Sequence, residues 1–232
     1  MKTLKVEHLG GIHRPLAADV PALLDAAGIG FEEIACAPWA EEYPYQPEVK
    51  VRIGITDEAF LLHYVVSEEY VAAAADADNG AVWEDSCCEF FCQPENDGTY
   101  YNVECNCMGT VLMGFGSSRD GRQLAPKETL KSIRRWSSLN PEPISNCDNT
   151  HIDKRTLPLQ KQEGKPWQLA LVVPFTAFFR HNITMKKGKI IRANFYKCGD
   201  KLPNPHFLAW NDISLPHPNF HCPDHFGTLN LL

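Results

Sequence analysis

The stretch AVWEDSCCEFF, residues 81–91, decides the fold that we expect. Alternate side chains of a β-strand share a face, so Cys88 and Phe90 would point into a core. The opposite side would carry Trp83, Asp85, Cys87, Glu89 and Phe91. An aromatic plane with two carboxylates does not suit a pure hydrophobic core, because burying an unpaired charge is costly. We therefore expect a strand with one core face and one face that meets water or a ligand.

Period-two patterns recur along the chain. Residues 49–55 alternate as in a strand with one wet face, and residues 59–66 indicate a strand buried on both faces. Further strands are expected at 99–107, 110–116, 167–175 and 189–197. Only ADVPALLDAAG (18–28) and PKETLKSIRRW (126–136) favour short peripheral helices. Many short strands with few helices favour an all-β fold, a β-sandwich of the immunoglobulin-like or jelly-roll-like kind.

Composition limits the class of protein. The 232 residues suit a single domain, 1–232, and a hydrophobic fraction of 44% provides for a substantial core. A formal net charge of −7 argues against a nucleic-acid partner, and no apolar run is long enough for a membrane span. The N-terminus lacks a secretory signal, and nine cysteines without a CxxC pair favour a reducing compartment. We expect a cytoplasmic protein as written, or a periplasmic or extracellular one if a leader was removed.

Four segments together resemble carbohydrate-binding module family nine and its single-domain relatives. They are VWEDSCCEFF (82–91), YYNVECNCMG (100–109), IRANFYK (191–197) and HCPDHFGTLNL (221–231). The resemblance covers about 49–116 and 167–232, and it leaves 1–48 and 117–166 as elaborations atypical of the family. It implies a β-sandwich that binds sugars without cleaving them.

The resemblance also implies a site in which two aromatic rings clamp a sugar. Trp83 matches the first clamp residue, and Glu89 matches an acid that contacts the sugar. Phe220 matches the second clamp residue, where the family's sugar binders carry Trp. A phenyl ring offers less stacking area than an indole and has no N–H donor.

Polar strand faces would complete this site. Glu104 stands where sugar binders carry a basic residue, and Asn194 stands where they also use an amide. Arg192 lies two residues before Asn194 on the same face and could supply the missing positive charge, and Tyr196 shares that face. Sugars stack their apolar faces on aromatic rings and bond their hydroxyl rims to polar groups. The resemblance and these faces together predict a mono- or oligosaccharide partner.

Other functions stay open at this point. Glu89 and Glu104 on neighbouring strands would suit the paired carboxylates of glycoside hydrolysis. An acid whose pKa is raised by burial beside its pair would indicate that chemistry. The chain could instead be a protein-interaction sandwich that has lost sugar binding, which would account for Phe220 and Glu104. Trp83 could also cover the core, and Glu89 with Arg192 could form a cross-strand ion pair.

Metal sites are a further alternative. Relatives in the family carry structural calcium, and Asp76, Asp78 and Asn79 offer oxygen ligands in a turn. Histidines recur every four residues from 217 to 225, but prolines between them oppose a helix that could present them to zinc. We expect no obligatory cofactor, and calcium is the candidate structural ion.

Overall fold

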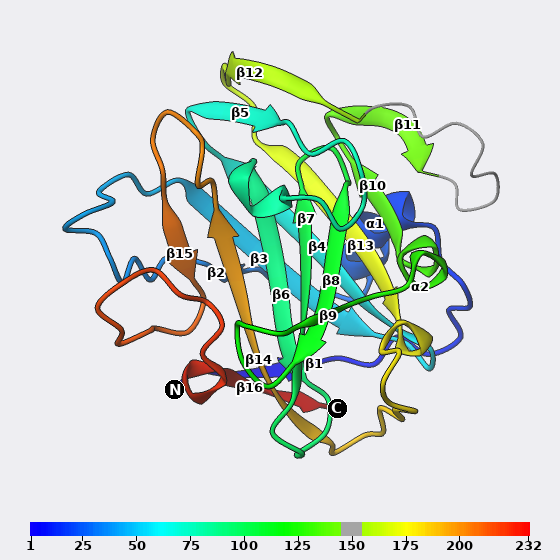
Figure 1. Cartoon of the computed structure of the whole chain (residues 1–232). Helices are drawn as coiled ribbons and strands as arrows, with labels where there is room; N and C mark the ends of the chain where they lie inside the picture. The colour runs from blue at the N-terminus through cyan, green and yellow to red at the C-terminus, as the bar shows by residue number, and fades with distance from the viewer. Residues whose placement is uncertain (145–154) are drawn as a thin grey trace.

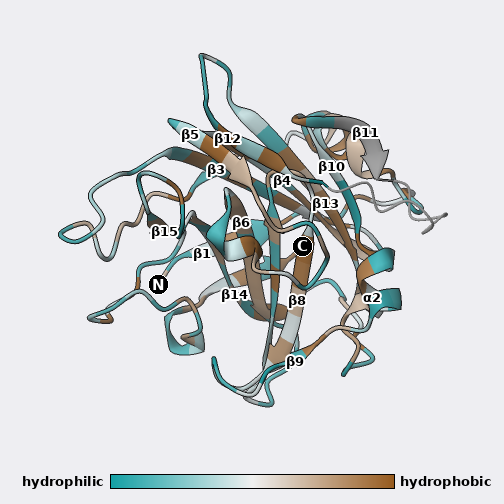
Figure 2. Cartoon of the chain, turned by 45° about the horizontal axis from the view of Figure 1, so that its top comes forward, coloured by the Kyte–Doolittle hydropathy of each residue, from teal (hydrophilic) through white to brown (hydrophobic). Residues whose placement is uncertain are grey.

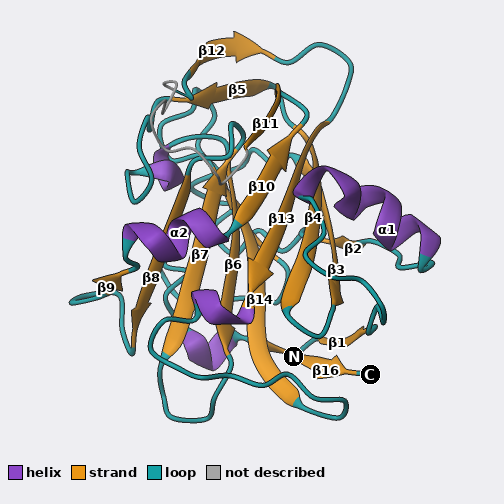
Figure 3. Cartoon of the chain, turned by 90° about the vertical axis from the view of Figure 1, so that its right-hand side faces the viewer, coloured by secondary structure: helices purple, strands orange, loops and turns teal. Residues whose placement is uncertain are grey.

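The computed structural model describes residues 1–144 and 155–232, so part of the segment 117–166 lies outside the described residues. Two β-sheets pack face to face (Figures 1 and 3). The first sheet contains, in spatial order, β1 (Thr3–Val6), β16 (Gly227–Leu231), β14 (Ile190–Cys198), β6 (Cys87–Gln93), β7 (Tyr100–Asn106), β8 (Val111–Gly116) and β9 (Gln123–Leu124), and β15 (Phe207–Ala209) pairs with β14. The second contains β11 (Asn140–Ile144), β10 (Arg134–Ser137), β13 (Trp167–Pro174), β4 (Ala59–Ser67), β3 (Glu48–Ile55) and β2 (Glu32–Glu33). β12 (Leu157–Lys161) and β5 (Tyr70–Ala73) form a separate pair. The expected β-sandwich is confirmed.

Two short α-helices lie at the periphery, within the two segments that favoured them. α1 (Val20–Ala26) lies over the outer face of the second sheet (Figure 3). α2 (Lys127–Ser132) ends earlier than expected, because from Arg134 the chain pairs with β13 as strand β10. Short 3₁₀ helices span Ala17–Asp19, Val82–Glu84, Phe175–Ala177 and Pro223–His225. None of the helices in the described part of the chain is long and apolar enough to cross a membrane.

The main core lies between the two sheets. Cys88, Phe90 and Cys92 of β6 are fully buried there, as the alternation predicted. Phe90 stacks on Phe195 of β14, with ring centroids 5.4 Å apart, and meets Phe60 of β4 edge to face. Hydrophobic residues gather along the strands, whereas the surrounding loops are mostly hydrophilic (Figure 2). Non-directional burial of these faces is the principal force that holds the two sheets together.

A second hydrophobic cluster lies on the outer face of the first sheet. Cys87 and Phe91, which alternate with the core residues of β6, belong to it together with Tyr100 and Tyr196. The segments that follow β14 and β15 fold over this face and contribute Phe220. The outer face of the first sheet is therefore only partly covered, and the candidate site lies there.

The strand expected over 81–91 begins only at Cys87. Residues 82–84 form a 3₁₀ helix instead. Asp85 is buried, and its carboxylate accepts the backbone N–H groups of Ala74 and Ala75 and the side-chain amide of Asn106. These bonds keep the residues just before β6 from continuing the strand. Asp85 is thus a structural residue, and Trp83 is not placed by strand alternation.

The prediction that one face of residues 49–55 meets water is wrong, because α1 and the segment around it cover that face. Arg52 is only 4% exposed, and its guanidinium donates to Asp25 at 2.6 Å and to the carbonyls of Pro21 and Ile29. A long basic side chain can be buried when most of its donors are paired. Strand β4 is buried on both faces, as expected.

Candidate carbohydrate-binding site

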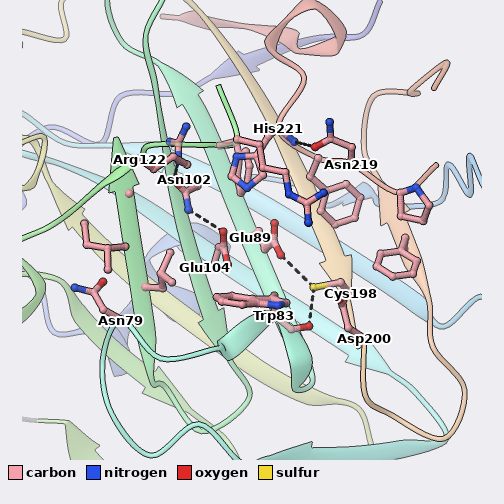
Figure 4. Close-up of a pocket in the computed structure, with 18 residues that line it drawn as sticks. Asn79, Trp83, Glu89, Asn102, Glu104, Arg122, Cys198, Asp200, Asn219 and His221 are labelled. Carbon is pink, nitrogen blue, oxygen red and sulfur yellow. Dashed lines mark hydrogen bonds between the residues drawn. The ribbon is translucent and has the colours of Figure 1, made fainter. Parts of the chain in front are cut away.

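The candidate site is a pocket of about 370 Å³ on the outer face of the first sheet (Figure 4). Glu89 of β6 and Asn102 and Glu104 of β7 form its floor. The walls come from Val82–Glu84, 119–124, 198–200 and 218–221. The floor thus comes from strand positions of one face, whereas the walls come from segments far apart in the sequence.

Trp83 forms one wall, and its side chain is 39% exposed. Its backbone carbonyl accepts the Asp200 N–H at 3.2 Å and lies 3.4 Å from the Cys198 sulfur, which places the 3₁₀ helix against the end of β14. Figure 4 shows the indole lying beside Glu89 at the edge of the floor. An indole exposed at the wall of a pocket can stack on the apolar face of a ring.

Glu89 and Glu104 lie side by side on the floor. They are register partners on β6 and β7, and they are 3% and 4% exposed. Burial, with Cys198 and Glu104 nearby, raises the pKa of Glu89 well above its usual value. Burial also raises the pKa of Glu104 to about 7, against the opposing effect of Asn102. The predicted proximity of these two acids is therefore a feature of the structure.

Each acid has one neighbour that bonds it. The Cys198 thiol donates to Glu89 Oε1 at 3.1 Å, and the Asn102 amide donates to Glu104 Oε1 at 2.8 Å. Within the described residues, the second oxygen of each carboxyl, Oε2, is buried without a hydrogen-bond partner. A buried polar atom without a partner is costly unless a ligand or water supplies one.

Arg122 extends this arrangement from the loop after β8. Its Nε donates to Asn102 Oδ1 at 2.9 Å, and its guanidinium lies over the Tyr100 ring at 4.1 Å. Gly114 makes the contact feasible, because a Cβ there would meet Asn102 Oδ1 at 2.6 Å and Arg122 Nε at 3.2 Å. The chain Arg122–Asn102–Glu104 orients the floor amide, since an amide whose oxygen accepts from Arg122 must present its N–H to Glu104.

The wall at 218–221 rests on aromatic packing. Phe220 stacks on Tyr196 with centroids 4.1 Å apart and 5° between the planes, and the Tyr196 hydroxyl donates to the Phe220 carbonyl at 3.2 Å. His221 shares a hydrogen bond with the Tyr100 hydroxyl at 2.9 Å. Burial lowers the pKa of His221 to about 3, so its ring is neutral at neutral pH.

Trp83 and Phe220 thus line the same pocket but contribute unequally. Phe220 is 8% exposed, because Tyr196 covers one face of its ring. Trp83 offers far more free ring surface. In a clamp formed by these two residues, Trp83 would offer the face of its ring to a ligand, whereas Phe220 would offer only the part of its ring that Tyr196 leaves uncovered.

Three residues expected at the site do not line the pocket. Arg192 donates to the backbone carbonyls of Asp224 and Phe226. Asn194 is fully buried; its amide donates to the Asn211 carbonyl, and its oxygen accepts two backbone N–H groups. Tyr196 lies beneath Phe220. They share a strand face as predicted, but the segment 211–226 covers that face. Arg192 also forms no ion pair with Glu89 in the described part of the chain.

Arg122, Asp200, Asn219 and His221 line the pocket and were not expected there. The flanks of Phe220 were a usable signal for Asn219 and His221, since the neighbours of a predicted wall residue lie near the same ligand. Arg122 and Asp200 carry no local signal, because they belong to loops whose course depends on tertiary packing.

The turn residues expected to bind calcium are occupied by internal bonds. Asp78 Oδ1 accepts from Arg135 at 2.7 Å and from the Val111 N–H at 3.0 Å. Asn79 bonds the Ala125 carbonyl and the Met113 N–H, whereas Asp76 is exposed. Among the described residues, one group places three metal-ligating atoms within 4.8 Å of one another, and it consists of Cys87, Glu89 and Cys198. The histidines at 217–225 do not form such a group within the described residues.

Comparison with known proteins identifies the family. The sequence profile of carbohydrate-binding family 9 matches residues 18–231. The chain belongs to this family. The matched residues include 18–48 and 117–166, which belong to the segments expected to be atypical of the family. Part of 117–166 lies outside the described residues.

Solved structures agree with membership of carbohydrate-binding family 9. A Bacteroides uniformis protein that carries a provisional description as carbohydrate-binding is 44% identical, with a TM-score of 0.89, over 100% of this chain and 99% of that chain. A family 9 module from Caldicellulosiruptor kristjanssonii in complex with cellotriose has 10% identity and a TM-score of 0.61, over 99% and 93%. The glucose complex has 11% identity and a TM-score of 0.57, over 100% and 96%. No match is found among curated proteins.

Membership of carbohydrate-binding family 9 decides between the functions left open by the sequence. Members bind carbohydrate through a β-sandwich and are not catalytic, so neither the enzyme nor the protein-interaction alternative is favoured. The acids Glu89 and Glu104 do show the raised pKa expected of catalytic carboxyls. Desolvation is the largest cause in both, and it acts on any acid on a buried floor.

Proposed function

We propose that the pocket above β6 and β7 binds a single sugar unit or the end of a glycan chain, with Trp83 stacked on the ring. The observation that carries this proposal is an exposed indole beside a buried floor with two unpartnered carboxyl oxygens, Glu89 Oε2 and Glu104 Oε2. Such a combination offers an apolar plane and polar acceptors to the two chemically different surfaces of a sugar.

The size of the pocket supports a small ligand. A volume of about 370 Å³ lies near the low end of small-molecule pockets, for which roughly 300–1,000 Å³ is typical, and suits one or two sugar rings. The complexes of Caldicellulosiruptor kristjanssonii modules with glucose and cellotriose make glucose-based sugars the first ligands to test.

Calorimetric titration with glucose, cellobiose and xylobiose tests the proposal. Trp83→Ala is the test variant, and Phe31→Ala is its matched control, because Phe31 is also 39% exposed but does not line the pocket. Thermal unfolding of both variants checks that each is folded. We expect Trp83→Ala to abolish measurable binding of a sugar that the wild type and Phe31→Ala both bind.

Two results would overturn the proposal. The first is equal binding by wild type and folded Trp83→Ala, which would place the ligand elsewhere. The second is the absence of binding across the whole panel, extended to a plant-glycan hydrolysate, by folded wild-type protein.

We also propose that the chain works in a reducing compartment. Six of the eight described cysteines are buried, and all eight are free. Buried thiols of this kind behave as small hydrophobic side chains. Alkylation of the purified protein, unfolded without reductant, should modify all nine cysteines of the sequence; fewer would indicate disulfides.

A further inference from the structure

The floor of the pocket holds two acids whose ionisation no neighbouring cation of the described residues compensates. Glu89 and Glu104 are register partners, and both are more than nine-tenths buried. Their Oε2 atoms have no hydrogen-bond partner, and neither residue forms an ion pair within the described part of the chain. Asp200, a third acid, lines the same pocket.

The cations of the pocket do not neutralise this pair directly. Arg122 directs Nε to the Asn102 side chain and its two terminal nitrogens to the carbonyls of Ser118 and Tyr100. Arg119 is exposed to solvent at the rim. The Arg122 guanidinium is therefore separated from Glu104 by the Asn102 side chain.

An ammonium group fits these acids better than a hydroxyl. It donates up to three hydrogen bonds and brings a full positive charge that allows the acids to ionise, whereas a hydroxyl donates one bond and brings no charge. Two carboxylates side by side repel each other, and a cation between them removes that repulsion. Trp83, on the adjoining wall, offers its face to the remainder of the ring or to the cation itself.

We propose that this pocket selects amino sugars with a free amine, held with the ammonium between Glu89 and Glu104 and the ring against Trp83. This inference rests on the proposed function, since it names the ligand class of the same pocket. Burial raises the pKa of both acids, so the empty pocket retains protons at neutral pH. An ammonium group takes the place of those protons, and its binding therefore releases them to the solvent.

Calorimetry of the wild-type protein with three sugars of the same ring size tests this inference. The sugars are glucosamine, glucose and N-acetylglucosamine, in which the amine is free, absent and blocked, and their β-1,4-linked dimers provide a second set. We expect glucosamine or its dimer to bind at least about tenfold more tightly than the neutral analogues. The binding heat of the amino sugar should also vary with the ionisation enthalpy of the buffer, which reports proton release.

Glu104→Gln is the variant that isolates the charge. Its side-chain oxygen can still accept from Asn102, so the floor keeps its hydrogen bond. The ratio of amino-sugar to neutral-sugar affinity should fall towards one. Glu128→Gln, an exposed acid on α2, is the control and should keep the wild-type ratio.

The outcomes separate this inference from the proposed function. Binding of neutral sugars with equal or greater affinity than amino sugars would overturn the inference and leave the proposed function standing. An amino-sugar preference that survives in folded Glu104→Gln would also overturn it. Absence of binding to every sugar tested would overturn both.

Discussion

Glu89 and Glu104 lie directly opposite each other on β6 and β7, with their side chains on the pocket floor and one oxygen of each left without a partner in the described structure. Ionising both would place two negative charges in a poorly hydrated site. The folded protein therefore holds protons on these acids that the unfolded chain would release. This relationship predicts how the stability of the unliganded protein depends on pH.

Glu104→Gln should become more stable relative to wild type as the pH rises. The folded pKa of Glu104, about 7, lies above the ordinary value of 4.5, so the folded state binds more protons between these values. Stability due to this acid is then lost as pH rises from about 4.5 through about 7, on the order of 3 kcal/mol in all. Thermal unfolding of both proteins from pH 5 to 8 measures the difference.

The comparison with wild type is needed because other groups titrate in the same range. Burial raises the pKa of Asp200 to about 6 and lowers that of His63 to about 4, and these groups remain in both proteins. Cys198, Asn102 and Arg122 also face the acid pair. A constant difference in unfolding temperature across the pH range would show that Glu104 is ionised throughout.

Gly114→Ala should disturb the pocket floor. The added methyl group would lie 2.6 Å from Asn102 Oδ1, so the amide must move and its bonds to Arg122 and Glu104 weaken. We expect a loss of about 1–3 kcal/mol in the free energy of unfolding, measured by urea titration, and weaker sugar binding. Gly116→Ala, on the same strand, meets its nearest atoms at 3.6 Å and is the control. Equal stability of the two variants would contradict this role for Gly114.

Asn194→Ala should lower stability rather than remove a ligand contact. The Asn194 side chain joins β14 to the Asn211 backbone through two hydrogen bonds of 2.9 and 2.8 Å, in a fully buried position. Its loss leaves buried backbone groups unpaired, and we expect a cost of about 2–4 kcal/mol in chemical denaturation. A variant of wild-type stability that has lost sugar binding would instead support the sugar contact inferred from the sequence.

Tyr196→Phe should have a small effect on both stability and binding. The ring that supports Phe220 remains, and only the bond from the hydroxyl to the Phe220 carbonyl is lost. We expect about 1 kcal/mol lower stability and a sugar affinity within about threefold of wild type, by unfolding and calorimetry. A tenfold loss of affinity at unchanged stability would indicate that the hydroxyl itself reaches the sugar.

Local sequence patterns predicted the strands and their faces well. Cys88 and Phe90 point into the core, and Glu89 and Glu104 share the opposite face, because alternation depends only on the backbone of each strand. The same reasoning failed at Trp83, where bonds made by Asp85 to residues ten and eleven positions earlier bend the chain into a 3₁₀ helix.

The sequence by itself determined the all-β class, the core face of each strand and the acid pair of the floor. Only the tertiary structure decided which polar faces stay open: α1 covers Arg52, the segment 211–226 covers Asn194, and Glu89 and Glu104 remain on the floor of an open pocket. The physical reason is that alternation is a property of a single strand, whereas covering depends on contacts between distant segments. The bond between Tyr100 and His221, which joins residues 121 positions apart, is one such contact, and no local pattern encodes it.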